Sequence, residues 1–220
     1  MGIIGDTHLP FERPDYLNFC VKIFDRCKCK TIVHIGDLVD SHSISFFEHD
    51  SDGKSPADEM KEVDKRLRRW IDCFPELYLC LGNHDLLFYR KIKAAGLPGR
   101  ILKSFEDIWE LPIGWQVGES WEFDGVRYIH GTGLSGRNAH IKAAELGRQS
   151  TVIGHTHSTG GQITYLVSES DRIWGMNVGC GIDRKAYAFQ YGYNLLKKPV
   201  LGCGVVTDKG NYCQWFPMDL

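Results

Sequence analysis

The sequence predicts an α/β protein, and three observations support this prediction. Short apolar runs typical of β-strands cover residues 1–5, 31–36 and 77–81. Segments with the apolar spacing of amphipathic helices separate these runs. Each run ends in a polar or acidic motif, and ligands gather outside the carboxyl ends of parallel strands. We therefore expect βαβ units and a largely parallel sheet in the first part of the chain.

Two helices are predicted between these strands. Apolar residues recur at i, i+3 and i+4 spacing over 16–24 and again over 60–71. Ser55 and Pro56 fit the N-cap and the first position of the second helix. Arg90 falls on a further helical segment that directly follows one of the polar motifs.

The pattern changes after Gly96, where strands follow one another more closely. Asp124-Gly125 is a hairpin signal between strands expected at 121–123 and 126–129. Further strands are expected over 151–153, 162–167 and 173–178, with a last hairpin around 208–211. The second half is therefore expected to contain more antiparallel sheet.

Length and composition fit one globular domain covering residues 1–220. No apolar run approaches the ~20 residues of a membrane-spanning helix, so no membrane partner is expected. The N-terminus lacks the pattern of a secretion signal, which favours a cytoplasmic location with all eight cysteines reduced. A net charge of −2 gives no general attraction to nucleic acid, so any phosphate must be attracted by the site itself.

Four polar motifs contain most of the candidate metal-binding and catalytic side chains. They are Asp6-Thr7-His8, Gly36-Asp37-Leu38-Val39-Asp40, Gly82-Asn83-His84-Asp85 and Gly154-His155-Thr156-His157. Together they supply carboxylate, amide and imidazole groups in the proportions of a two-metal hydrolytic centre. Asp6 and His8 are two residues apart, so an extended backbone would place both side chains on one side, and His155 and His157 repeat this spacing.

The ligand types narrow the choice of metal. The Asp37 carboxylate has two oxygens and can bridge two ions, while Asn83 offers an amide oxygen. His130 is the candidate for a further imidazole, because it ends the strand 126–129 and precedes a Gly-rich turn. Mixed imidazole and carboxylate ligation suits Mn, Fe, Zn, Co or Ni better than Ca or Mg. We expect two divalent transition-metal ions, manganese foremost.

The motifs resemble those of the calcineurin-like metallophosphoesterase family. The family pattern reads D-x-H, G-D-x-x-D, G-N-H-[DE], a lone His and G-H-x-H, and all five elements occur in order between positions 6 and 157. Residues 177–180 also resemble the Asn-x-Gly-Ser turn of many members, with Cys in place of Ser. The resemblance implies two stacked mixed β-sheets flanked by helices, an αββα sandwich.

The resemblance also implies a role for each motif residue. One metal would be held by Asp6, His8, Asp37 and His157, and the second by Asp37, Asn83, His130 and His155. His84 would lie nearest the leaving group, and Asp40 would orient its imidazole through a hydrogen bond. The implied reaction is attack of a metal-bridging hydroxide on a phosphoester, with His84 assisting the departing oxygen.

The resemblance is closer to some branches of the family than to others. Leu9-Pro10 after the first motif, Ser41-His42 after the second and Asp85 in the third depart from the protein-phosphatase branch. A compact phosphoesterase of bacterial or phage type, acting on a nucleotide or nucleic-acid phosphodiester, is the favoured interpretation. The alternatives are a phosphomonoesterase with the same metals and a non-catalytic scaffold of the same fold, which the presence of His84 and Asp40 disfavours.

Three side chains are candidates for substrate contacts. Arg137 and Asn138 lie on the Gly-rich stretch after His130, where backbone N–H groups can also meet a phosphate. Arg90 follows Gly-Asn-His-Asp closely. His34, by contrast, lies inside a predicted strand and is expected to pack rather than to bind a metal.

Overall fold

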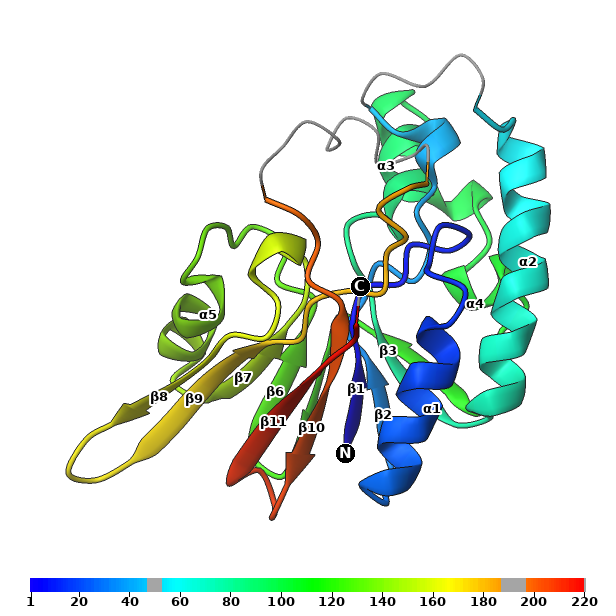
Figure 1. The fold of residues 1–220 in the computed structure, drawn as a ribbon. Coiled ribbons are helices and arrows are strands. Elements are labelled where there is room, and N and C mark those ends of the chain that lie inside the picture. The colour runs from blue at the N-terminus through cyan, green and yellow to red at the C-terminus, as the bar shows by residue number, and fades with distance from the viewer. Residues whose placement is uncertain (47–52, 187–196, 220) are drawn as a thin grey trace.

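The computed structural model describes residues 1–46, 53–186 and 197–219. Two β-sheets pack against each other, and helices cover their outer faces (Figure 1). Both sheets contain parallel and antiparallel neighbours. The fold is therefore the α/β sandwich of two mixed sheets that the sequence predicted.

The first sheet has the strand order β11-β10-β1-β2-β3-β4. Its parallel strands are β1 (Gly2–Ile4), β2 (Ile32–His34), β3 (Leu77–Cys80) and β4 (Trp115–Gly118). The antiparallel hairpin of β10 (Gly202–Thr207) and β11 (Tyr212–Pro217) extends this sheet next to β1. The predicted parallel arrangement of the first three strands is confirmed, whereas β4 was not predicted.

The second sheet has the strand order β5-β6-β7-β9-β8. Its strands are β5 (Ser120–Phe123), β6 (Val126–Ile129), β7 (Ser150–Ile153), β8 (Ile163–Val167) and β9 (Arg172–Asn177). The hairpin at Asp124-Gly125 is confirmed, with both residues at positive φ. The expected antiparallel pairing occurs at the two edges, whereas β6, β7 and β9 at the centre are parallel.

The two helices predicted from strong apolar spacing begin and end near their predicted positions. The α-helices are α1 (Tyr16–Arg26), α2 (Pro56–Cys73), α3 (Leu87–Ala94), α4 (Phe105–Ile108) and α5 (Ala139–Gly147). Short 3-10 turns cover His42–Ile44, Gly99–Ile101 and His157–Thr159. Ser55 caps α2 as predicted, because its hydroxyl accepts a hydrogen bond from the Asp58 N–H.

Apolar side chains fill the spaces between the layers. Ile3, Val152 and Met176 are buried between the two sheets. Trp70 on α2 and Phe24 on α1 belong to a second cluster on the outer face of the first sheet. This packing holds the two sheets together, and among the described residues no helix is long and apolar enough to cross a membrane.

Candidate metal centre

The predicted ligands follow the carboxyl ends of strands in both sheets. Asp6 and His8 come after β1, Asp37 after β2, Asn83 after β3, His130 after β6, and His155 and His157 after β7. The Asp6 carboxylate accepts a hydrogen bond from the His155 N–H at 2.9 Å, so the ends of β1 and β7 meet although they belong to different sheets. One end of the sandwich therefore gathers all of these residues.

A first cluster combines two carboxylates and two imidazoles. Its members are Asp6, His8, Asp37 and His157, whose candidate ligand atoms all lie within 4.8 Å of one another. Nε2 of His157 lies 3.0 Å from Oδ2 of Asp6 and 3.2 Å from Nε2 of His8. These are the residues to which the resemblance assigned one metal.

A second cluster forms around His130. Its Nε2 atom lies 3.1 Å from each of three ligand atoms: Oδ2 of Asp37, Oδ1 of Asn83 and Nδ1 of His155. Asp37, His130 and His155 form a candidate metal group. Asp37 belongs to both clusters, so its carboxylate can join two ions.

The donor atoms of the two clusters fit divalent transition metals. Each cluster brings two imidazole nitrogens within 3.2 Å of each other, a pair that a shared cation stabilises. Oδ1 of Asp6 is buried and has no hydrogen-bond partner among the residues that the structure describes. His130 Nδ1 lies 3.9 Å from this oxygen, too far for a hydrogen bond. A buried carboxylate oxygen without a hydrogen bond is costly, and metal coordination is one way to compensate for it.

The backbone at the centre differs from the extended conformation expected from the residue spacing. His8, Asp37 and His155 have φ angles of 50°, 48° and 64°, in the left-handed region that is uncommon for residues other than glycine, although Asp and His adopt it more often than most. The expectation that alternation in extended backbone aligns Asp6 with His8 is therefore wrong. Turns bring the ligands together instead, and strained backbone of this kind is concentrated at functional sites.

Two glycines leave room for the carboxylates. A Cβ atom at Gly82 would lie 2.1 Å from Oδ1 of Asp37, and one at Gly154 would lie 2.1 Å from Oδ1 of Asp6. Both distances are far shorter than a van der Waals contact, so a side chain at either position would displace a predicted ligand. Each glycine thus allows a carboxylate from another motif to approach the backbone closely.

Asp40 contacts two histidines through different atoms. Its Oδ1 atom lies 2.5 Å from Nδ1 of His8, whereas its backbone carbonyl lies 2.7 Å from Nδ1 of His84. The Asp40 carboxylate is 3.5 Å from the same His84 nitrogen. The hydrogen bond expected between the Asp40 side chain and His84 is thus replaced by one to the main chain, and the carboxylate holds His8.

The buried charges shift one another's pKa values. Burial raises the pKa of Asp40 to about 6. Burial alone would lower the pKa of His130, but Asp37 and then Asp6 outweigh it and raise that pKa to about 9. The pKa of Asp37 is well below its usual value, because His130, His84 and His8 outweigh the effect of burial. Binding of a cation to His130 would therefore release a proton.

Asp85 connects two of the motif loops. Its carboxylate accepts hydrogen bonds from the Val39 N–H at 3.0 Å and from the Gly82 N–H at 2.8 Å. These two donors lie in the loops that follow β2 and β3, so Asp85 fixes the loops relative to each other. The sequence singled out Asp85 only as a mark of the family branch and did not predict this role.

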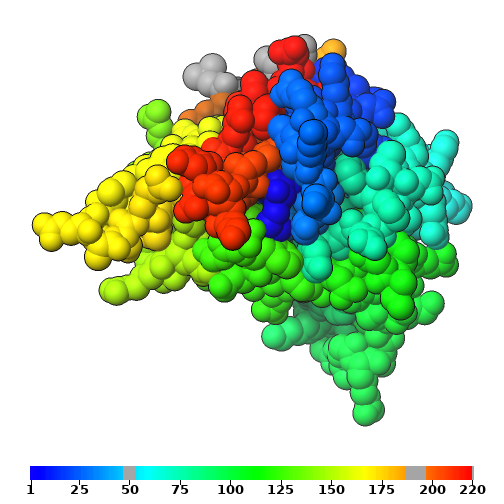
Figure 2. All heavy atoms as spheres, turned by 90° about the horizontal axis from the view of Figure 1, so that it is seen from below, coloured from blue at the N-terminus to red at the C-terminus, as the bar shows by residue number. Residues whose placement is uncertain are grey.

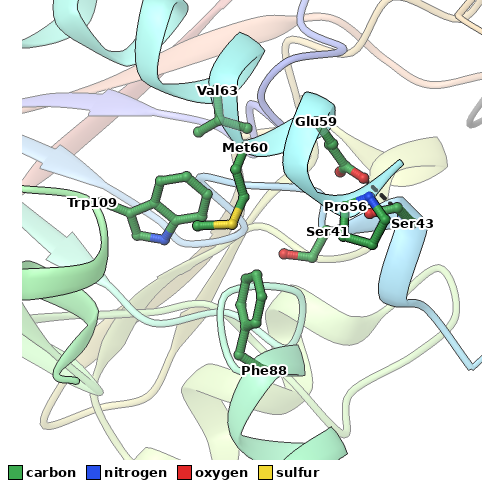
Figure 3. Close-up of a pocket in the computed structure, with 8 residues that line it drawn as sticks. All are labelled: Ser41, Ser43, Pro56, Glu59, Met60, Val63, Phe88 and Trp109. Carbon is green, nitrogen blue, oxygen red and sulfur yellow. Dashed lines mark hydrogen bonds between the residues drawn. The ribbon is translucent and has the colours of Figure 1, made fainter. Parts of the chain in front are cut away.

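Glu59 on α2 holds the loop that follows Asp40. Its two carboxylate oxygens accept hydrogen bonds from the backbone N–H groups of His42 and Ser43, both at 2.8 Å. Figure 3 shows Glu59 beside Ser41 and Ser43 at the wall of a small pocket. Sequence reasoning missed Glu59, because an acidic residue in the first turn of a helix is ordinarily explained by the helix dipole.

Asn177 fixes the Gly-His-Thr-His loop from the end of β9. Its side-chain amide donates to Oγ1 of Thr156 at 2.6 Å, and its Oδ1 atom accepts a hydrogen bond from the Gly179 N–H at 2.8 Å. His34 is fully buried and lies 3.0 Å from the Thr7 hydroxyl, so it packs as predicted. Burial lowers the pKa of His34 to about 3.

The predicted substrate contacts lie outside the ligand clusters. Arg137 and Asn138 are exposed residues at the start of α5. Arg90 is exposed on α3, and its guanidinium lies 5.3 Å from the centre of the Phe46 ring. Among the described residues, no side-chain hydrogen bond or ion pair joins any of the three to a predicted metal ligand.

The fold and the two clusters fit the class of metal-dependent phosphoester hydrolases. The family model described as calcineurin-like phosphoesterase matches residues 1–159, and the chain belongs to this family. The Asp and His clusters of the structure fit the divalent metals that such enzymes use.

Two solved structures resemble the chain over most of its length. Vacuolar protein sorting 29 from Cryptosporidium parvum has 11% identity and a TM-score of 0.45, covering 99% of this chain and 97% of its own. YfcE, a phosphoesterase from E. coli, has 15% identity and a TM-score of 0.42, covering 92% of this chain and 86% of its own. Both scores are low, so the family assignment rests on the family model alone. A search of curated proteins gave no match.

Proposed function

We propose that the protein is a dinuclear-metal phosphodiesterase that acts on nucleotide or nucleic-acid esters. The observation that supports this proposal most directly is the position of Asp37. Its carboxylate lies 3.6 Å from Nε2 of His8 in the first cluster and 3.1 Å from Nε2 of His130 in the second. A carboxylate shared in this way is what a pair of neighbouring ions requires.

In this proposal each cluster holds one ion. Asp6, His8, Asp37 and His157 hold the first, and Asp37, Asn83, His130 and His155 hold the second. When bound, two such ions lower the pKa of a shared water and neutralise phosphate charge. Manganese is the first metal to test, and the cytoplasmic location expected from the sequence stays a prediction.

His84 is the proposed catalytic residue at the leaving group. Its Nδ1 atom is bonded to the Asp40 carbonyl, which leaves Nε2 as the ring nitrogen that can meet a substrate. The side chain is 29% exposed, in contrast to His8 and His130, which are almost fully buried. A substrate can therefore reach His84, and the proposed ligand His157, whose side chain is 24% exposed, is also accessible from solvent.

The preference for a diester is supported by the sequence around the first motif. Asp6-Thr7-His8-Leu9 is similar to the opening of the nuclease and phosphodiesterase branches of the family. Arg137, Asn138 and Arg90 are proposed to contact the substrate beyond the scissile phosphate, because all three are exposed. Cationic and amide groups are suitable partners for phosphate oxygens.

The proposal is tested by comparing a diester with a monoester. Hydrolysis of bis-p-nitrophenyl phosphate and of p-nitrophenyl phosphate is measured with Mn²⁺, and again after chelation. The diester should be preferred, and chelation should abolish turnover. His84→Ala should lower the diester rate by ~10²–10⁴-fold while Mn²⁺ still binds. Lys142→Ala, an exposed change on α5, is the matched control.

The possible outcomes separate the alternatives. Preference for the monoester would replace the proposed diesterase with a phosphomonoesterase that uses the same metals. Full diester activity in His84→Ala would overturn the role of that residue. Tight Mn²⁺ binding without turnover of either ester would contradict the proposed activity and favour a scaffold.

A further inference from the structure

A second polar hollow lies away from the metal centre and has a volume of about 250 Å³. Its walls are the turn 124–125, residues 148–150 before and in β7, residues 172–174 of β9 and the turn 209–211. Figure 2 looks onto this end of the molecule, where the red β10–β11 turn lies beside the green β5–β6 turn. These four segments come from both sheets.

The hollow and the metal centre occupy opposite ends of the same strands. β6 and β7 begin next to the hollow, whereas the predicted ligands His130 and His155 follow their carboxyl ends. A four-residue strand such as β7 spans roughly 13 Å, so a small ligand in the hollow cannot reach the metal centre. The hollow is therefore a separate site.

Positive charge predominates among the residues that line the hollow. Arg148, Arg172 and Lys209 contribute three cationic side chains, and Asp124 is the one acidic residue in the lining. None of the three cations forms an ion pair with a residue that the structure describes. The whole chain has a net charge of −2, so this surplus of positive charge is local.

The walls of the hollow are joined by hydrogen bonds. The indole N–H of Trp174 donates to the Gly210 carbonyl at 2.9 Å, and the Trp174 backbone N–H donates to the Ser150 hydroxyl at 3.2 Å. Arg172 donates to the Asn211 carbonyl at 3.2 Å and lies over the ring of Tyr212. These contacts fix the walls of the hollow and the Arg172 guanidinium before any ligand arrives, which reduces the cost of binding.

We propose that this hollow binds the phosphate group of a small phosphate-bearing ligand, independently of the metal centre. A phosphate dianion would balance the surplus of positive charge, and arginine side chains suit its oxygens because they can donate two parallel hydrogen bonds. The volume accommodates a phosphate group with a modest organic substituent. Free inorganic phosphate and the phosphoryl group of a nucleotide share this chemistry.

The test reads binding from the metal-free protein, so it does not depend on phosphodiesterase activity. Backbone amide signals are followed by NMR in the presence of a chelator while inorganic phosphate or adenosine monophosphate is added. Saturable shifts are expected at Gly125, Gln149 and Gly210, whereas Gly131 and Gly154 near the metal centre should not shift. Stronger binding of the nucleotide would identify the phosphoryl group of an organic ligand, and stronger binding of inorganic phosphate would identify the free ion; equal binding would show that the hollow recognises the phosphate group alone.

Charge-removing variants complete the test. Arg148→Gln combined with Lys209→Gln should weaken the binding of either probe about tenfold, because two favourable charge interactions are lost. Lys142→Gln on α5 removes an exposed charge outside the hollow and should leave binding unchanged. The proposal is overturned if no saturable shift occurs, if shifts appear only near the metal centre, or if the double variant binds like the unchanged protein.

Discussion

Nδ1 of His8 and Oδ1 of Asp40 lie 2.5 Å apart and join the first motif to the second across 32 positions of the chain. Both side chains are buried, so the carboxylate fixes the orientation of the imidazole. The Nε2 atom of His8 consequently faces Asp37 and His157. A carboxylate that accepts the outer N–H of a ligating histidine commonly strengthens and orients that ligand.

Asp40→Asn is expected to weaken metal binding. The change removes the charged partner of His8 but keeps the backbone carbonyl that contacts His84. We expect the affinity for Mn²⁺ to fall ~10–100-fold, as measured by calorimetry. His84→Ala serves as the comparison, because it should lower turnover while leaving this affinity largely intact. Equal Mn²⁺ affinity in Asp40→Asn and the unchanged protein would contradict the role of the carboxylate.

Glu59→Gln is expected to loosen the loop after Asp40. The amide can accept only one of the two backbone hydrogen bonds and directs N–H groups at the other donor. The free energy of unfolding, measured by urea titration, should fall by about 1–3 kcal/mol. The affinity for Mn²⁺ should also fall, because Asp40 lies two residues before His42.

Glu62→Gln is the matched control on the same helix. The Glu62 side chain is 41% exposed and its carboxylate lies 3.8 Å from Lys54, so the change should alter stability by less than about 1 kcal/mol. Metal affinity should be unchanged. If Glu59→Gln lowers stability but binds Mn²⁺ normally, Glu59 supports the fold without positioning Asp40.

Metal binding is expected to stabilise the protein against heat. The two clusters place buried Asp6 and Asp37 among imidazoles, and an ion that binds only the folded state adds about 2.7 kcal/mol at a hundredfold excess over Kd. For a chain of this size that corresponds to a rise of roughly 5–11 °C in Tm. Differential scanning calorimetry with increasing Mn²⁺ measures this rise. A Tm that does not respond to Mn²⁺, or responds equally in Asp37→Asn, would argue against binding at these clusters.

Glu12 is expected to make stability depend on pH. Burial raises its pKa above the ordinary value of 4.5, although Arg66 opposes this shift from 3.0 Å. The folded state therefore favours protonated Glu12. Protonated Glu12 contributes to the stability of the folded state below pH 4.5. This contribution is lost as pH rises through the raised pKa of the folded state.

Glu12→Gln should reduce this loss. The free energy of unfolding, measured by urea titration at a series of pH values, should fall less for the variant than for the unchanged protein as pH rises above 4.5. Glu62→Gln again provides the comparison, because the Glu62 side chain is partly exposed. Parallel curves for Glu12→Gln and the unchanged protein would show that burial of Glu12 has no such effect.

The parts of the fold that could be predicted have strong local patterns. The strands before Asp6 and Asp37 are short apolar runs that end in acidic motifs, and Ser55-Pro56 is a clear helix start. The strand β4 was missed because its four residues show no marked pattern, and pairing with β3 stabilises it. The helix α5 was missed because its buried face consists mostly of alanine, which gives little apolar contrast.

The sequence identified the residues of the centre better than their contacts. His130 could be placed because it ends a strand as the other ligands do. The bond between Asp40 and His8, and the clamp that Glu59 forms on the loop, depend on tertiary contacts over 32 and 17 positions. Local sequence patterns do not predict contacts between residues so far apart in the chain. The positive φ of His8 likewise results from the surrounding structure, because positive φ is uncommon for any residue other than glycine.

The close approach of Gly82 to Asp37 and of Gly154 to Asp6 changes how the motifs of this chain should be read. Each glycine belongs to one motif by position and to another by the carboxylate that it accommodates. The motifs are therefore interdependent rather than separate signatures, and an acid cannot keep its position if the glycine opposite it acquires a side chain. A protein engineer who moved the centre to another scaffold would have to transfer these acid and glycine pairs together.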